Sequence, residues 1–320
     1  MLKVRSLGLL IVFFVMSVIF FGCDTKKEAV DSEAVKTEAA QTETAQSQKT
    51  ETEDDFCTRE NLKNLANRYF EAIAAHDSSM MPIAENVKFT ENGHEIAVGD
   101  GFWKSAGKVL LTRHLIDTFK CGTHTQAVVE ENDAEGKPRP ILFGLRLQYK
   151  DREITEIETI IAREKEFAFT PQGVLATKDE DWETVLPPEE RSSRLAMVAA
   201  ADDYFEMFSE EPHVSTPFAE ICDRWENGAQ TTVKNDQFPF PEGGREHNCS
   251  PKGLVIDHPP RRVPLVDVEA GIVVAYVHFA GLPDFHMFKM RNGKVDLIQA
   301  VIGPQSPSTG WPIEPLCLEK

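Results

Sequence analysis

A pattern that occurs twice in this chain constrains its fold more than any other feature. The sequence Ala-Asn-Arg-Tyr-Phe-Glu at 66–71 returns as Ala-Asp-Asp-Tyr-Phe-Glu at 201–206, and Glu-Asn-Gly at 91–93 returns at 226–228. The two copies of each pattern are 135 residues apart. That spacing is much longer than a solenoid repeat and matches the size of one small domain. The sequence therefore predicts two similar domains that arose by duplication.

The composition agrees with two domains and excludes one class of partner. The chain has 320 residues, of which 41% are hydrophobic, and a formal net charge of −18. This is enough apolar material for about two cores once a leader and a linker are set aside. An acidic surface repels phosphate groups, so we expect no nucleic-acid partner and no attachment to anionic lipids by charge.

The first 22 residues have the pattern of a secretory signal. Lys3 and Arg5 precede an apolar run over 7–21, which is short for a membrane span of roughly 20 residues. The run ends in Gly22-Cys23, which resembles the lipobox of bacterial lipoprotein signal peptides. The resemblance implies cleavage after residue 22, diacylation of Cys23 and anchoring in the lipid bilayer on the exported side, the periplasmic face in a Gram-negative cell. An uncleaved signal anchor is the alternative.

Residues 23–55 do not have the composition of a domain. They lack Gly, Pro and aromatic residues and consist mainly of Thr, Glu, Ala, Gln, Ser and Lys. Such a sequence cannot bury enough surface to offset the loss of conformational entropy on ordering. We therefore predict a disordered acidic tether between the anchor and the two domains.

Each copy opens with an amphipathic helix. In copy one, six apolar side chains recur with the spacing of one helix face: Leu62, Leu65, Ala66, Tyr69, Phe70 and Ile73. Copy two repeats this face from Met197 to Phe208. Thr58 is the expected N-cap of the first helix.

Strands follow the helix in both copies. A short strand over 87–91 leads into the turn Asn92-Gly93, because both residues tolerate a positive φ. Alternating segments and turn residues predict three later strands in copy one and four in copy two, over 126–130, 140–149, 153–162, 262–268, 272–280, 285–290 and 294–302. We place the first domain at 56–185 and the second at 186–320.

This order of elements resembles the NTF2-like, SnoaL-type cone fold. The resemblance is carried by the helix ending at His76-Asp77, the segment Phe89-Thr90-Glu91-Asn92-Gly93 and the last strand from Arg152 to Ile157. Two such copies look like a family of secreted proteins of unknown function. The resemblance implies an α+β fold class with two tandem NTF2-like domains, each with an N-terminal helix packed on a curved, mainly antiparallel sheet.

The last strand of each copy supplies the first pocket candidates. Glu158 shares a strand face with Ile154, Glu156 and Ile160, and Gln299 occupies the same place in copy two. If this face lines the pocket between sheet and helix, burial would raise the pKa of Glu158 and suit it to proton abstraction. The alternative is that both residues lie on the other, more solvated face of the sheet.

Other candidates lie near the helix and the Glu-Asn-Gly turn. Glu91 and His76 join Glu158 as candidate catalytic residues, and Tyr69, Trp103, Tyr204 and Glu226 join Gln299 as candidate ligand-binding residues. For Glu91 and Glu226 the alternative is turn chemistry, in which the side chain accepts hydrogen bonds from backbone N–H groups. His76 and Trp103 are candidates for the pocket rim.

The cysteines fit an oxidising compartment. Cys222 begins the strand that leads to the second Glu-Asn-Gly turn, and Cys249 lies in an irregular insertion with little core of its own, so we predict a disulfide between them. A bond between Cys57 and Cys121 is the second choice, which leaves Cys317 free.

The sequence offers no compact metal-binding spacing, phosphate loop or nucleophile elbow, so we expect no metal, no cofactor and no nucleophilic hydrolysis.

Two function classes remain. One is a membrane-anchored module that binds a small hydrophobic molecule. The other is a cofactor-independent lyase, isomerase or dehydratase that uses Glu158 or Glu91 as base, with His76 or Trp103 orienting the substrate.

Overall fold

The computed structural model describes residues 56–234, 245–251, 255–256 and 258–313, all of which belong to one compact unit, Thr50–Lys320. The predicted signal peptide, the predicted tether, Cys23 and Cys317 lie outside the described residues. Among the described residues, no helix combines the length and the apolar character that a membrane span requires.

The first domain is one helix on a six-stranded sheet. Its sheet has the order β2-β1-β6-β5-β4-β3, in which β1 and β6 are parallel and the other neighbours are antiparallel. Its elements are α2 (Arg59–Ala75), η1 (Ser78–Met80), β1 (Ile83–Glu91), β2 (His94–Glu95), η2 (Gly101–Lys104), β3 (Ala106–Asp117), β4 (Gly122–Asn132), β5 (Pro138–Lys150) and β6 (Glu153–Ala162).

The second domain repeats this arrangement. Its sheet has the order β8-β7-β12-β11-β10-β9, again with one parallel pair, β7 and β12. Between the two sheets in the chain lie α3 (Pro171–Ala176) and η3 (Pro188–Glu190), followed by α4 (Arg194–Glu206), β7 (Phe218–Glu226), β8 (Ala229–Gln230), β9 (Arg261–Asp267), β10 (Ile272–Phe279), β11 (Leu282–Arg291) and β12 (Lys294–Ile302).

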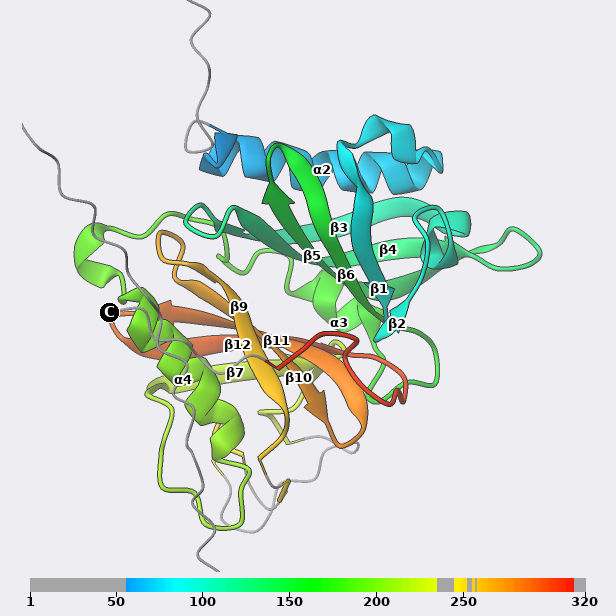
Figure 1. The fold of residues 1–320 in the computed structure, drawn as a ribbon. Coiled ribbons are helices and arrows are strands. Elements are labelled where there is room, and N and C mark those ends of the chain that lie inside the picture. The colour runs from blue at the N-terminus through cyan, green and yellow to red at the C-terminus, as the bar shows by residue number, and fades with distance from the viewer. Residues whose placement is uncertain (1–55, 235–244, 252–254, 257, 314–320) are drawn as a thin grey trace, which may run out of the picture. The chain divides into compact units, whose positions relative to one another are not determined.

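The two sheets pack face to face and the helices lie outside them. Figure 1 shows α2 over the outer face of the first sheet and α4 over the outer face of the second. Three clusters of buried apolar residues match these layers: one between α2 and its sheet, one between α4 and its sheet, and one between the two sheets. Both faces of each sheet are therefore buried.

The local predictions agree with the structure at most elements. Thr58 caps α2 by accepting a hydrogen bond from the Asn61 N–H, and all six residues of the predicted apolar face are buried. Asn92 and Gly93 both have a positive φ, as do Asn227 and Gly228. The predicted strands lie inside the observed ones or agree with their ends to within one residue, but β3 was not predicted, since its sequence does not alternate clearly.

Both predicted disulfides are present. Cys222 is bonded to Cys249 and Cys57 to Cys121. The first bond holds the insertion of the second domain against β7. The second joins Cys57, which precedes the N-cap of α2, to the turn between β3 and β4.

A glycine in the first sheet allows close approach of the second sheet. A Cβ added to Gly144 on β5 would lie 2.1 Å from the ring of Phe285 on β11, which is closer than carbon atoms can approach. The aromatic ring occupies the space that a side chain at position 144 would need. The contact between the sheets is therefore a specific fit and not a loose apolar surface.

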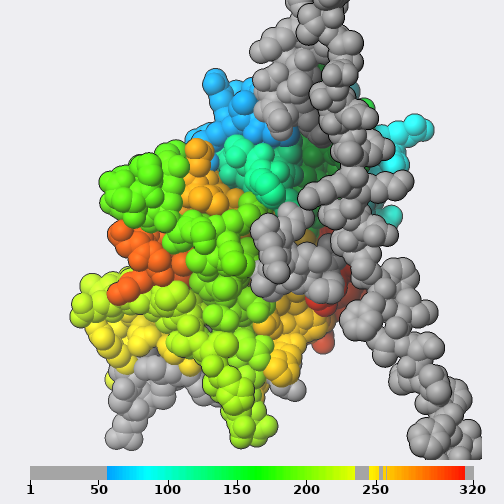
Figure 2. Space-filling view, turned by 60° about the vertical axis from the view of Figure 1, so that its left-hand side comes forward, coloured from blue at the N-terminus to red at the C-terminus, as the bar shows by residue number. Residues whose placement is uncertain are grey.

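Two ion pairs cross between the domains in a reciprocal manner. Arg59, at the start of α2, binds Asp267 at the end of β9 with distances of 2.8 and 2.9 Å. Arg194, the first residue of α4, binds Asp117 at the end of β3 with distances of 2.6 and 3.0 Å. In Figure 2 the orange turn that follows β9 lies against the blue surface of α2.

Each of these aspartates also accepts a backbone hydrogen bond from the other domain. The Ile116 N–H donates to Asp267, and the Val266 N–H donates to Asp117. Both carboxylates are about 1% exposed. The edge strands β3 and β9 are thereby joined through side chains, and the two domains are related by an approximate two-fold axis.

The segments that follow the two sheets are exchanged in the same way. Thr170, after the first sheet, lies against Gly228 in the second domain, and Ser308, after the second sheet, lies against Gly93 in the first. A Cβ at either glycine would lie about 2 Å from a carbonyl oxygen of the crossing segment. The Asn-Gly turns therefore need glycine for this close approach as well as for their positive φ.

We predict that Asp267→Asn lowers the free energy of unfolding by about 2–3 kcal/mol, because it leaves the Arg59 guanidinium without its buried counter-charge. Asp117→Asn should have a similar effect through Arg194. Glu269→Gln is the matched control: its carboxylate is 44% exposed and 3.5 Å from Arg59, so we expect a change below about 0.5 kcal/mol. Denaturant unfolding measures all three, and equal effects at 267 and 269 would contradict the prediction.

A second prediction concerns acid stability. Burial, with the charge of Arg146 adding to it, lowers the pKa of His124 to about 3. The unfolded state, with a pKa near 6.5, then binds more protons than the folded state, so stability is present above about pH 6.5 and is lost as the pH falls. His124→Gln should make the midpoint of thermal unfolding less dependent on pH between about 7 and 5. The exposed His94→Gln is the control and should leave the pH dependence unchanged.

Candidate functional site

Four charged or titratable side chains face α4 on the outer face of the second sheet. Arg224 and Glu226 come from β7, and Asp284 and His286 come from β11. The strand between them, β12, places Ala300 opposite both Glu226 and His286. Because the alanine side chain is short, β12 places no large side chain between the two charged strands. We call these four residues together with Tyr204 the polar cluster.

Arg224 connects the polar cluster to the helix. Its Nη1 donates to the Tyr204 hydroxyl at 2.8 Å and to the Cys249 carbonyl at 3.2 Å. Its Nε donates to the Thr231 hydroxyl at 2.9 Å and lies 3.4 Å from a Glu226 oxygen. The Tyr204 oxygen accepts from Arg224, so its own O–H proton is left to donate to another group.

Asp284 and His286 form a buried pair. His286 Nδ1 lies 3.1 Å from Asp284 Oδ1, and the two side chains are 4% and 0% exposed. A carboxylate accepts hydrogen bonds, so Nδ1 carries the proton when the histidine is neutral and Nε2 has the free lone pair. The second carboxylate oxygen, Asp284 Oδ2, is buried and has no hydrogen-bond partner.

Aromatic rings enclose the histidine of this pair. The ring of His286 lies 5.1 Å from that of Phe205, 5.5 Å from Tyr204 and 6.1 Å from Phe288. Two of these rings come from α4 and one from β11. The Asp284–His286 pair is therefore held against an apolar wall, with Arg224 and Glu226 on β7, the strand beyond β12.

The pKa values of the two carboxylates in the polar cluster are shifted in opposite directions. Burial raises the pKa of Asp284 above its ordinary value, and the nearby His286 offsets only part of that rise. Burial acts in the same direction on Glu226, but Arg224 and His286 outweigh it and the pKa of Glu226 lies below its ordinary value. Burial also raises the pKa of Tyr204 to about 12, so the hydroxyl stays protonated near neutral pH. Asp284 is thus the more basic of the two acids.

The first domain has apolar residues at the matching positions. Strand pairing aligns His286 with Leu145 and Asp284 with Phe143, and the 135-residue offset aligns Arg224 with Phe89. All three residues of the first domain are buried in its apolar core. The polar cluster is therefore not a requirement of the fold, because the same architecture forms without it.

The ligand-binding candidates of the first domain lie in its core. Trp103 and Tyr69 are 2% and 1% exposed, and the Trp103 Nε1–H donates to the Tyr69 hydroxyl at 3.2 Å. His76 is exposed at the C-cap of α2, where its Nδ1 bonds the Trp103 carbonyl. Trp103 contacts both His76 and Tyr69, so these candidates use their polar groups on one another.

Glu91 takes part in turn chemistry, the alternative considered from the sequence. It accepts a hydrogen bond from the Phe102 N–H at 2.9 Å and lies 4.0 Å from Arg163. Burial raises its pKa, with the Phe102 N–H and the Arg163 charge acting against that rise. Its counterpart Glu226 instead belongs to the polar cluster, together with the predicted Tyr204.

Glu158 and Gln299 lie on the face of each sheet away from the helix, contrary to the expectation that they line a pocket. Glu158 binds Arg146 of its own sheet at 2.7 Å and Arg262 of the second domain. Gln299 accepts from Gln126 at 3.2 Å across the interface. These contacts use both side chains to join the two sheets, so neither faces a helix-side pocket.

Sequence reasoning did not select Arg224, Asp284 or His286 as site residues. A signal was present: Asp284 and His286 alternate within an apolar strand, at positions where the first copy has Phe143 and Leu145. Within the described parts of the chain, no three His, Cys, Asp or Glu side chains lie close enough together to hold a metal ion.

Comparisons with known proteins match one family model and several solved structures to parts of the chain. Residues 190–302 match a family model described as Domain of unknown function (DUF8021). No curated protein matches the chain. The order of strands in each sheet, with a helix on one face, is that of the NTF2-like fold. The chain has two tandem NTF2-like domains.

Three solved structures are similar to parts of the chain. AclR, a candidate hydroxylase from Streptomyces galilaeus, is 13% identical, with 38% of this chain and 92% of that chain covered and a TM-score of 0.28. An NTF2-like protein of unknown function from Cytophaga hutchinsonii is 10% identical, with 32% and 99% covered and a TM-score of 0.24. A candidate polyketide cyclase from a Silicibacter species is 19% identical, with 32% and 88% covered and a TM-score of 0.24. Likenesses at this level carry no argument about activity.

Proposed function

We propose that the second NTF2-like domain binds a small organic molecule at the polar cluster and transfers a proton to or from it without a cofactor. One observation carries the proposal. The second domain has Arg224, Asp284 and His286 where the first has three apolar residues, and Asp284 keeps a buried oxygen without a partner. Buried polar groups lower stability unless they are paired, so their presence in one copy alone points to a use other than folding.

The geometry supplies both a base and a stabilising group. With the Nδ1 proton held by Asp284, His286 Nε2 is a proton acceptor, and the buried carboxylate stabilises the imidazolium that results. Tyr204, bonded to Arg224, has an O–H that stabilises negative charge on a substrate oxygen. The substrate class is therefore a small molecule that has an acidic C–H or O–H next to an oxygen acceptor.

The aromatic rings around His286 add a preference for an apolar or aromatic body. This preference agrees with the hydrophobic ligand expected from the sequence, for which Tyr204 and Glu226 of the second domain were already candidates. Binding without turnover is the second candidate function, because the free Asp284 oxygen by itself favours a ligand with a hydrogen-bond donor.

Asp284→Asn tests the proposal. The amide keeps an acceptor for His286 but presents an N–H in place of the free oxygen, so we expect the folded protein to be at least as stable and to lose its ligand. A library of small oxygen-containing organic molecules is screened by thermal shift against the wild-type chain. Compounds that raise the midpoint are then incubated in D₂O, and deuterium incorporation at carbon is followed by NMR. We expect exchange to fall about 100-fold in Asp284→Asn.

The duplication provides a matched control for this experiment. Tyr204→Phe removes the hydroxyl that Arg224 bonds, and Tyr69→Phe removes the equivalent hydroxyl of the first domain. Only the change at 204 should weaken ligand binding. A ligand that binds Asp284→Asn and Tyr204→Phe as tightly as the wild type would overturn the proposed site. If ligand binding depends on both residues but no deuterium is incorporated, the second candidate function, binding without turnover, is the one supported.

We also propose that the chain is exported and held at the membrane through an acylated Cys23. The two disulfides support an oxidising compartment. The short apolar run that ends at Gly22-Cys23 supports lipidation. An anchor of this kind would leave both domains on the exported side of the membrane.

Mass spectrometry of the membrane fraction should find a mature protein that begins with a diacylated Cys23. Cys23→Ser should abolish that mass and release the protein from the membrane fraction or leave the signal uncleaved. A wild-type protein that still carries Met1 to Gly22 would contradict the prediction.

A further inference from the structure

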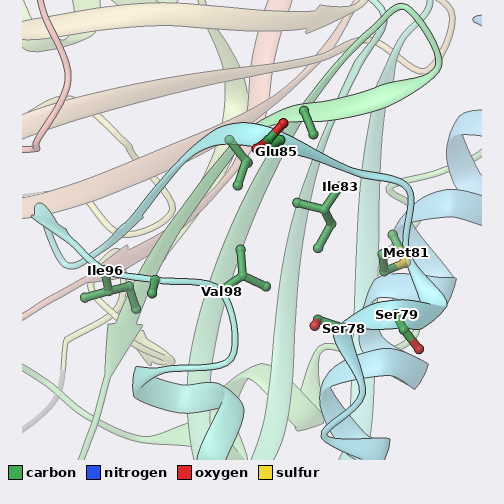
Figure 3. Close-up of a pocket in the computed structure, with 10 residues that line it drawn as sticks. Ser78, Ser79, Met81, Ile83, Glu85, Ile96 and Val98 are labelled. Atoms are coloured by element: carbon green, nitrogen blue, oxygen red, sulfur yellow. The ribbon is translucent and has the colours of Figure 1, made fainter.

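The first domain has an open hollow of about 530 Å³ beside β1. It is lined by apolar side chains, among them Met81, Ile83, Val87, Ile96 and Val98, and by the polar residues Ser78, Ser79 and Glu85. Figure 3 shows the side chains of Ile83 and Val98 extending into the space between β1 and the segment that follows β2. No residue of the polar cluster lines this hollow, because the polar cluster belongs to the second domain.

A bulge in β1 accompanies the hollow. Ile83 pairs with Ile154 and Lys88 with Glu156, so residues 84–87 lie opposite the single residue Thr155. Four residues in place of one push the strand away from its neighbour. The second domain repeats this bulge, because residues 219–222 of β7 lie opposite the single residue Asp296 of β12.

In the second domain, the protein's own chain occupies the equivalent place. At the 135-residue offset, Val87 corresponds to Cys222 and Ala97 to Thr232. His247 lies between these two, since the Cys222 N–H donates to the His247 carbonyl at 2.9 Å and the His247 N–H donates to the Thr232 carbonyl at 2.8 Å. The disulfide from Cys249 to Cys222 fixes the segment there.

The segment in the second domain also makes an ion pair at the position that corresponds to Glu85. Arg245, two residues before His247, lies 3.6 Å from the Glu220 carboxylate and donates to the Glu220 carbonyl at 3.4 Å. Glu220 corresponds to Glu85, which lines the hollow of the first domain. The second domain therefore shows what chemistry this surface accepts: an extended segment, a basic side chain toward the glutamate and a small buried side chain toward β7.

We infer that the hollow beside β1 is a binding site for an extended peptide segment of a partner protein. The peptide takes the place that residues 245–249 take in the second domain, with its backbone bonded to the Val87 N–H and the Ala97 carbonyl. Its basic residue lies near Glu85, and a small apolar residue four positions later lies against Val87 and Met81. This is peptide recognition by addition to a strand edge, with side-chain pockets setting the specificity.

A disulfide-trapping experiment tests the site directly. The probe is a six-residue peptide with the sequence of 245–250, Arg-Glu-His-Asn-Cys-Ser. The full chain carries Cys23→Ser and Cys317→Ser, so that Val87→Cys adds the only cysteine outside the two disulfides. In a thiol redox buffer, a bound peptide places its cysteine beside position 87, as Cys249 lies beside Cys222. We expect at least about 10-fold more peptide adduct by intact-protein mass spectrometry than for a cysteine elsewhere on the surface.

Lys137→Cys in the same background is the surface control, since residue 137 is exposed in the turn between β4 and β5. Glu85→Lys, added to Val87→Cys, should reduce the adduct, because it repels the arginine of the peptide. A peptide of the same composition in scrambled order should form no more adduct with Val87→Cys than the original peptide forms with Lys137→Cys. Equal adduct at 87 and 137, or equal reaction of the scrambled peptide, would overturn the inference.

A non-covalent measurement covers the case in which Val87→Cys disturbs β1. The peptide with Ser in place of Cys is labelled with a fluorophore and titrated with the wild-type chain and with Glu85→Lys, a change at an exposed residue. We expect saturable polarization with the wild type and several-fold weaker binding with Glu85→Lys. A hydrophobic dye that binds the hollow and is not displaced by the peptide would instead identify a small-molecule pocket and contradict the peptide site.

Discussion

The reciprocal exchange of two arginines between the domains is the interaction on which the rest of the structure depends. Arg59 and Arg194 begin the two equivalent helices, and each reaches across to a buried aspartate of the other domain. Each aspartate also accepts a backbone N–H from the opposite edge strand. A buried carboxylate is tolerated only when it is paired and hydrogen-bonded, so these residues fix the relative position of the sheets closely.

This arrangement determines which faces remain for function. Because the sheets are packed against each other, the interior face of each is filled by the interface core and by the network of Glu158, Arg146 and Arg262. In the first domain this leaves the hollow beside β1, and in both domains it leaves the space between each sheet and its own helix. In the first domain that space is filled with aromatic rings, and in the second it contains the polar cluster.

The duplication explains how one copy could change its interior. Phe89, Phe143 and Leu145 show that the fold accepts an apolar interior, so the polar residues at the same positions of the second domain are a departure from what stability requires. A large shared interface and two disulfides stabilise the pair of domains together. The same comparison explains the hollow beside β1: both copies have the bulge, but only the second has an insertion that covers it.

The sequence by itself determined the local structure and the repeat. The offset of 135 residues is read directly from the chain. The apolar stripe capped by Thr58, the Asn-Gly turns and the pairing of Cys222 with Cys249 were predicted from residue types, their positions and the expected oxidising compartment. Which face of each strand lies toward the helix was decided only by the tertiary structure. The alternation of the strand puts Glu158 and Ile157 on opposite faces of the sheet. It identifies the helix side only when the other face is exposed to solvent, and here both faces are buried. Arg262, which binds Glu158, comes from the other domain, and two of the rings that enclose His286 beside Asp284 come from α4. These neighbours are remote in sequence and meet only in the tertiary structure.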